Sequence, residues 1–408
     1  MRRRIRVETL RGGMIWLLGF TSAFVFVEPS PYELVGLLGI GFFVLTGLTL
    51  LPALTPLLLL LVLLNVGYAM ALVQVINQSQ AVVWVLVSVF LATTAILYAS
   101  MLCSQTQRRL ELLMRGCLAA AVITSLLAIG AYFRLFGGIS DVFLLYGRAR
   151  ATFNDPNVLG GFLVLPGLLL YQRLLLGERM LRNALLLLPI AAALFLTFSR
   201  GAWGQFVFAA LLVMILAFIS TQSSGARVRI ILVAVLGLTL ILAAVAVLLS
   251  IGEVADLFKE RATLDQSYDL GRYGRFGRYV LGAEVALEHP FGIGPLQFGR
   301  YFTEDPHNTF LNAFMSGGWL GGFSYVTLCA VTAVLGLRVV LVPTPWQRTY
   351  QVLYAAYITT IVESAIIDID HWRAYFLMLG ALWGVMAASR NFAAAPVRSA
   401  SYPGSLVQ

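Results

Sequence analysis

Long apolar runs, separated by short polar connections, fill most of this chain. A helix that crosses the roughly 30 Å hydrocarbon layer of a membrane needs about 20 mostly apolar residues. Runs of that kind predict about twelve transmembrane helices, at 14–27, 34–51, 55–75, 81–103, 111–136, 157–176, 183–198, 202–220, 228–251, 309–337, 349–367 and 372–389. Only helices or closed barrels satisfy the backbone inside lipid, so we expect an all-α, polytopic integral membrane protein.

One long polar segment, 252–308, interrupts this pattern between the ninth and tenth runs. Within it, apolar positions recur at helical spacing and form one stripe: Phe276, Tyr279, Val280, Ala283 and Leu287. This spacing predicts an amphipathic helix that rests on the membrane bundle through its apolar stripe.

The composition agrees with a membrane protein, since 60% of the residues are hydrophobic and 12% are charged. A soluble domain carries roughly twice that charged share. The net charge of +9 would fit nucleic acid, but the charges follow the membrane instead. If the N-terminus is cytoplasmic, the inner segments hold 17 of the 28 basic residues and three acidic ones, against 11 basic and 16 acidic elsewhere. This satisfies the positive-inside rule, so we expect cytoplasmic termini and no nucleic-acid partner.

These features divide the chain into four expected parts. They are an N-terminal bundle of about nine helices at 1–251, a loop on the outer face with the candidate chemistry at 252–308, C-terminal transmembrane helices at 309–392, and a disordered cytoplasmic tail at 393–408. The five arginines before the first apolar run would also fit a signal peptide. No small-residue cleavage site follows them, so we expect a retained first helix.

Arginines on the outward side are candidate anion ligands. Arg200 lies between two apolar runs, where an arginine must be paired, reach the interface or face a polar cavity. Its planar donor fork suits phosphate oxygens, although an interface anchor is the alternative. Arg148 and Arg150 precede the sixth run, with the same two interpretations open.

A second group of arginines lies in the polar segment, as the triplet Arg272, Arg275 and Arg278. Arg275 and Arg278 are three residues apart and can project from one side of a helix. The Gly-Arg-aromatic repeat that contains them could also be sequence drift, so the three need not share one role.

His307 is a candidate proton acceptor, because histidine can take up a proton near neutral pH without special tuning. It stands just before the tenth run, on the side of the arginines. A capping or packing histidine is the alternative. His371, Asp368 and Asp370 are competing bases. One Asp-x-Asp motif and three cysteines in or beside apolar runs predict no metal site and no disulfide.

Several short motifs, in this order, resemble those of the O-antigen ligase and polymerase superfamily. They are Arg150 with Phe153–Gly160, Ser199–Trp203, Arg275 followed by His289–Pro295, and His307-Asn308 before a glycine-rich helix. Together they cover about 148–325. Tyr279 stands where many members carry Trp, and the triplet blurs which of its arginines has the family's role.

The resemblance implies an inverting, metal-independent and cofactor-free glycosyltransferase at the periplasmic face of a bacterial inner membrane. The donor would be a glycan on undecaprenyl diphosphate, and the acceptor a sugar hydroxyl of lipid A-core or of a growing glycan. His307 would be the base, and Arg200 and Arg275 would bind the diphosphate with Arg272, Arg150 and Arg278. Supporting residues would be Asn157, Asn308, Asp368, Asp370 and His371.

Ligase and polymerase need the same leaving-group ligands and base, so the motifs do not separate them. The Pro306–Asn312 segment and the single long loop favour a ligase. A transporter of lipid-linked sugars would carry charges near the middle of the membrane, where only Glu363 lies clearly inside a run. A scaffold in polysaccharide assembly would leave Arg200 and His307 without a purpose.

Overall fold

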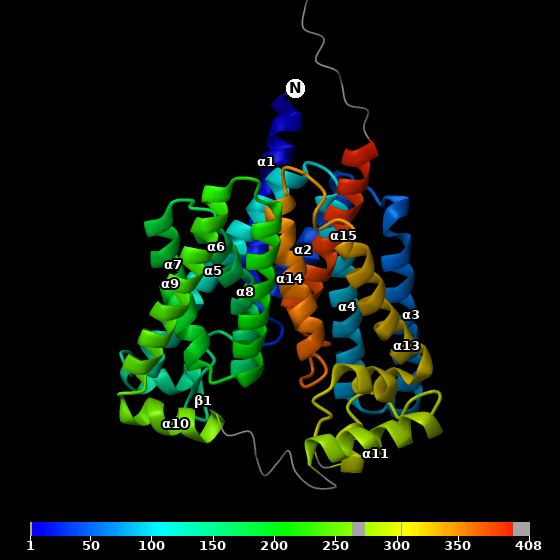
Figure 1. Cartoon of the computed structure of the whole chain (residues 1–408). Helices are drawn as coiled ribbons and strands as arrows, with labels where there is room; N and C mark the ends of the chain where they lie inside the picture. Colours follow the sequence, from blue (N-terminus) through cyan, green and yellow to red (C-terminus); the bar gives the residue numbers. More distant parts are fainter. Residues whose placement is uncertain (1, 263–273, 303, 395–408) are drawn as a thin grey trace, which may run out of the picture.

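The computed structural model describes residues 2–262, 274–302 and 304–394 as a bundle of long helices (Figure 1). The helices are α1 (Arg2–Thr21), α2 (Pro31–Thr46), α3 (Thr55–Leu72), α4 (Ser79–Leu102), α5 (Thr106–Tyr132), α6 (Pro156–Leu175), α7 (Met180–Leu196), α8 (Arg200–Ser220), α9 (Ser224–Leu248), α10 (Gly252–Ala262), α11 (Arg275–Glu288), α12 (Phe298–Phe302), α13 (Thr309–Leu337), α14 (Gln347–Glu363) and α15 (Arg373–Ala394). Arg272 and the tail from 395 onward lie outside the described residues.

Other regular structure in the described ranges is short. Three 3₁₀ turns occur at Pro52–Leu54, Val73–Val75 and Gly137–Phe143. Two strands of two residues each, β1 (Leu144–Leu145) and β2 (Arg148–Ala149), pair antiparallel with Leu144 opposite Ala149. The all-α class expected from the sequence is confirmed.

Each of the twelve apolar runs coincides with one of the helices α1–α9 and α13–α15. Within the described ranges, eight helices are long and apolar enough to cross a membrane, and they begin at Pro52, Ser79, Thr106, Pro156, Arg200, Ser224, Thr309 and Arg373. Two more apolar helices, α2 and α7, are shorter. The chain is therefore a multi-pass membrane protein, and the full count of twelve spans stays a prediction.

The two ends of the bundle carry different elements. The start of α1 and the end of α15 lie at the end drawn at the top, which we call the termini end (Figure 1). The elements α10, α11 and β1 lie at the opposite end, which we call the loop end (Figure 1). The polar segment and the hairpin of β1 and β2 therefore lie at the same end of the bundle (Figure 1).

Helices approach each other closely at positions that are occupied by glycine. A Cβ on Gly67 of α3 would stand 2.6 Å from the backbone nitrogen of Gly321 in α13. A Cβ on Gly380 of α15 would stand 2.2 Å from the carbonyl oxygen of Ala95 in α4. Small residues allow such backbone approach in membrane bundles, where packing rather than the hydrophobic effect joins helices.

The glycine-rich stretch of α13 contains a break. Gly318 has φ 62° and ψ −165°, a backbone conformation that is not helical. The Pro290 carbonyl oxygen accepts a hydrogen bond from the Trp319 N–H at 2.9 Å, and Ile293 N–H donates to Met315 O at 2.8 Å. The turn after α11 is thereby fixed in the break, so α13 consists of a short segment at the loop end and a longer one that continues toward the other end of the bundle.

The amphipathic helix in the polar segment is present as α11, but its expected orientation was wrong. Phe276, Val280 and Leu287 of the predicted stripe are exposed, whereas Gly282 and Ala286 are buried. A Cβ on Gly282 would come within 2.9 Å of Leu311 and Phe298 side-chain atoms. The small residues therefore make the closest contact with the bundle, whereas Tyr279 is the large side chain of the stripe that packs against it.

Candidate active site

His307 lies at the loop end, directly before α13, in a backbone conformation with φ 47°. One carboxylate fixes this turn, because Asp368 accepts the His307 N–H at Oδ2 (3.0 Å) and the Asn308 N–H at Oδ1 (3.1 Å). The Asn308 side chain then caps α13 by accepting the Leu311 N–H at 3.1 Å. The connection between α14 and α15 thus fixes the backbone that presents the histidine.

The helix α11 contacts the same residue from another side. The Tyr279 hydroxyl donates a hydrogen bond of 2.8 Å to the His307 carbonyl oxygen. The imidazole remains 42% exposed, and its Nδ1 lies 3.7 Å from Asp368 Oδ2. The His307 backbone is therefore held at both its N–H and its carbonyl, while the ring stays accessible.

The surroundings of His307 favour its neutral form. Burial lowers the pKa of His307 most, and the positive charge of Arg275 and Arg278 lowers it further. The carboxylates of Asp305 and Glu304 act in the opposite direction with smaller effect. A neutral imidazole can accept a proton, so this histidine suits a general base.

Asp368 and Asp370 form a second polar group beside His307. Burial raises the pKa of Asp368, and the charges of Asp370 and Asp305 raise it further. Asp370 Oδ2 accepts a hydrogen bond from Asn312 Nδ2 at 2.7 Å, and its Oδ1 lies 3.4 Å from His371 Nδ1. Both carboxylates therefore tie the α14–α15 connection to the start of α13.

Arg200 and Arg275 are each the first residue of a helix at the loop end, and both side chains are half-buried. Ser199 caps α8 by accepting the Ala202 N–H at 3.3 Å, which fixes the start of the helix at Arg200. Gly274 is the residue directly before α11, and it provides no side-chain cap. The N-terminal ends of helices favour anions, so both arginines stand where an anionic group is stabilised.

The other candidate arginines are engaged in local contacts. Arg278 is buried and its Nη2 lies 2.7 Å from Glu304 Oε2. Arg150 donates to the Val142 carbonyl at 3.0 Å, and its guanidinium stands 5.0 Å from the Phe26 ring centre.

Arg148 is buried and connects two helices. Its Nε donates to the Thr197 carbonyl at 2.7 Å, and its Nη2 donates to Asn157 Oδ1 at 2.8 Å. Asn157 thus holds an arginine that ties the end of α7 to the start of α6. The sequence showed Arg148 as a candidate cation, but not this contact across about fifty residues.

Glu363 is a buried acid that sequence reasoning gave no role. Its side chain is 4% exposed, and neither carboxylate oxygen has a hydrogen-bond partner within the described ranges. A Cβ on Gly201 would stand 2.6 Å from Glu363 Oε1, so the acid lies against the first turn of α8. Its signal in the sequence was a lone acid inside an apolar run, which often marks function in membrane proteins.

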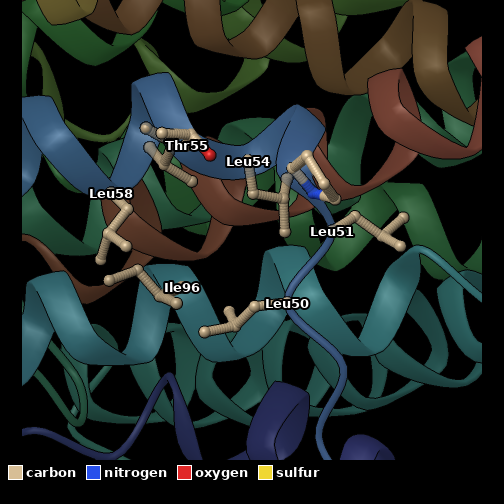
Figure 2. A pocket seen from close by; sticks show the side chains of 8 residues that line it. Leu50, Leu51, Leu54, Thr55, Leu58 and Ile96 are labelled. Atoms are coloured by element: carbon tan, nitrogen blue, oxygen red, sulfur yellow. The ribbon is translucent and has the colours of Figure 1, made fainter.

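Two cavities differ in chemistry. One of about 270 Å³ lies at the start of α3 against Ile96 of α4, and leucines with Pro52 and Thr55 form the rest of its lining (Figure 2). The other, of about 230 Å³, is bordered by Asp368, Asp370 and His371. The second cavity is therefore the one whose lining has groups that can exchange a proton. Within the described ranges, no three His, Cys, Asp or Glu side chains come together as a metal site.

Residues 184–326 match a protein-family model described as O-antigen ligase. The matched segment is less than half of the 408 residues, and runs from α7 to the middle of α13. It contains Arg200, Arg275 and His307, whereas Asp368 and Asp370 lie beyond it. No curated protein matches the chain. Over this segment the chain is similar to the O-antigen ligase family, in agreement with the resemblance of its motifs.

Proposed function

We propose that the protein is a glycosyltransferase of the O-antigen ligase type. It transfers a glycan from undecaprenyl diphosphate to a sugar hydroxyl of lipid A-core, with inversion and without a metal. The observation that carries the proposal is His307, which Asp368 and Tyr279 hold by the backbone and whose pKa burial and Arg275 lower. This residue also lies inside the segment that matches the O-antigen ligase family.

The acceptor hydroxyl gives its proton to the imidazole. His307 Nδ1 faces Asp368 at 3.7 Å, so Nε2 is the nitrogen that accepts the proton. The hydroxyl oxygen then bonds to the anomeric carbon of the donor sugar as the bond from that carbon to the diphosphate oxygen breaks. Attack opposite the leaving group inverts the anomeric centre. Asp368 keeps the histidine in place through its backbone N–H while the diphosphate departs.

The diphosphate carries the negative charge that develops as the bond breaks, and fixed cations stabilise that charge most effectively. We assign Arg200 and Arg275 to this task, with Arg272 as a further ligand outside the described residues. We assign positioning roles to Arg278, which pairs with Glu304, and to Arg150, which donates to the Val142 carbonyl. The polyprenyl tail stays in the lipid beside the bundle.

The proposed orientation places the loop end in the periplasm of a bacterium and both termini in the cytoplasm. The arginine distribution supports this orientation. The common position of the start of α1 and the end of α15, opposite α11, is also consistent with it (Figure 1). A polymerase that extends the lipid-linked glycan would use the same residues, so the acceptor decides between the two.

Glycolipids of a deletion strain test the proposal. Lipopolysaccharide and undecaprenyl-linked glycan are separated and compared with those of the strain complemented by the intact gene. Long polymer on the lipid carrier with bare core in the lipopolysaccharide supports a ligase, and core capped by a single repeat supports a polymerase. An unchanged pattern in both fractions contradicts the O-antigen assignment.

A further inference from the structure

The cavity of about 230 Å³ at the loop end shares a residue with the His307 site. Its lining includes Asp368, whose carboxylate holds the His307 and Asn308 N–H groups. Arg200, Arg275 and His307 do not line it, so Asp368 is its link to His307. The cavity therefore adjoins the proposed base without including the arginines that we assign to the diphosphate.

The charge of this cavity disfavours an anion. Asp368 and Asp370 line it, and the one lining arginine, Arg373, is bonded to Glu33 (3.0 and 2.8 Å) and to Glu28 (2.8 Å). Glu28 and Glu33 thus offset the charge of Arg373, and Asp368 and Asp370 add carboxyl groups to the lining. A diphosphate would be repelled here, whereas hydroxyl or amino groups would find acceptors.

The remaining lining suits a sugar ring. Phe153, Phe162 and Trp372 supply aromatic surface on which the apolar face of a sugar can pack. His371 Nδ1 is buried and makes no hydrogen bond in the described part of the chain. The volume is below the roughly 300–1,000 Å³ of pockets for drug-sized ligands, which fits one ring and excludes a lipid.

The polar groups are also fixed in place before any ligand binds. The His371 ring packs against Trp84 with centres 4.3 Å apart, and its Nε2 lies 3.0 Å from the Trp84 carbonyl oxygen. Asp370 is held by Asn312 at 2.7 Å. Prior fixation of this kind reduces the entropy cost of binding.

We propose that this cavity binds the terminal sugar ring of the acceptor, uncharged or carrying an amino group, and directs one of its hydroxyls to His307. The proposal rests on the proposed function and adds the place where the acceptor binds. The anionic donor and the uncharged or cationic acceptor are then bound at separate places.

Filling the cavity tests this proposal in the purified full-length protein. Val158 lines the cavity from α6 and is half-buried. Val158→Phe is expected to raise the KM for rough lipopolysaccharide, the acceptor probe, by about tenfold or more and to leave the KM for the undecaprenyl-linked donor unchanged. If Val158→Phe does not fold, Ala374→Leu, in α15, fills the same cavity and replaces it in the test.

Leu58→Phe is the matched control, because it fills the apolar cavity of similar size at the other end of the bundle (Figure 2). It should change neither KM. Equal increases in both KM values, or no change for the acceptor, would overturn the acceptor site.

His307→Asn separates the two proposals. If it abolishes transfer while Val158→Phe spares the acceptor KM, only the acceptor site fails. If His307→Asn transfers glycan normally, the role of His307 as the base fails, and if the unchanged protein transfers no glycan, the proposed function itself fails.

Discussion

The two ends of the bundle use charged residues differently. At the termini end, the terminal nitrogens of Arg109 bond to Glu8 (3.0 Å) and to the Met101 carbonyl (2.8 Å), and Glu8 also pairs with Arg11 at 2.9 Å. At the loop end, the His307 backbone is fully bonded while its ring stays exposed, and Glu363 has no hydrogen-bond partner within the described ranges. Polar groups that are paired and buried hold helices together, whereas the exposed ring of His307 on its fixed backbone is available to a substrate.

The largest effect is expected from the proposed diphosphate ligands. Replacing both Arg200 and Arg275 by lysine keeps the charge but removes the planar fork. The rate of glycan transfer should fall by about 10³-fold or more, as for the loss of fixed donors in other transferring enzymes. Arg115→Lys is the control, because Arg115 forms an exposed pair with Glu111, and such pairs contribute little. Equal rates in both variants would contradict the assignment.

The break in α13 provides the next test. Gly318→Ala places a Cβ 2.4 Å from the Pro290 carbonyl oxygen, in a backbone region that glycine alone adopts readily. We expect a loss of about 3 kcal/mol or more in stability, seen as a lower thermal unfolding midpoint in detergent. Gly41→Ala in α2 has nothing within 4 Å and should be neutral. A stable Gly318→Ala protein would show that the break does not need glycine.

A smaller effect is expected at the termini end. Glu8→Gln removes the charge that pairs with the buried Arg109 and with Arg11. The cost should be about 2 kcal/mol of stability, again measured by thermal unfolding. Transfer per folded molecule should stay at the level of the unchanged protein. A loss of transfer without a loss of stability would contradict the division between the two ends.

The smallest effect concerns pH. Burial, with the charges of Arg275 and Arg278, lowers the pKa of His307. The base must be unprotonated, so kcat/KM should fall on the acid side, at a pH below the ordinary histidine value. Arg278→Gln removes one cause of the lowered pKa, so this fall should move toward higher pH. A profile that does not change would show that another group limits the rate.

The approximate positions of the helices could be predicted from the sequence, because segments that lie in lipid are apolar. The residues at which the helices begin and end were less predictable. The first apolar run begins at 14, yet α1 begins at Arg2, since backbone hydrogen bonding continues into polar sequence where hydropathy gives no signal. The break at Gly318 was also hidden, because it depends on the carbonyl of Pro290.

The site was predictable as a set of residue types and less so as a set of contacts. Asp368 was a candidate base, whereas the structure shows its carboxylate bonded to the backbone of His307, 61 residues away. The orientation of α11 was wrong because the expectation gave weight to large apolar residues, while close packing selected Gly282 and Ala286. Pairings of this kind depend on tertiary contacts that no local pattern contains.

Transfer by the purified protein tests the central claim most directly. His307→Asn keeps a residue that tolerates the φ of 47° and removes the base. With undecaprenyl-linked glycan and rough lipopolysaccharide, we predict a rate about 10²–10⁴-fold below that of the unchanged protein. His289→Asn, at the end of α11, should transfer normally. Full transfer by His307→Asn would contradict the account, because the loop end would then have no proton acceptor at the position proposed here.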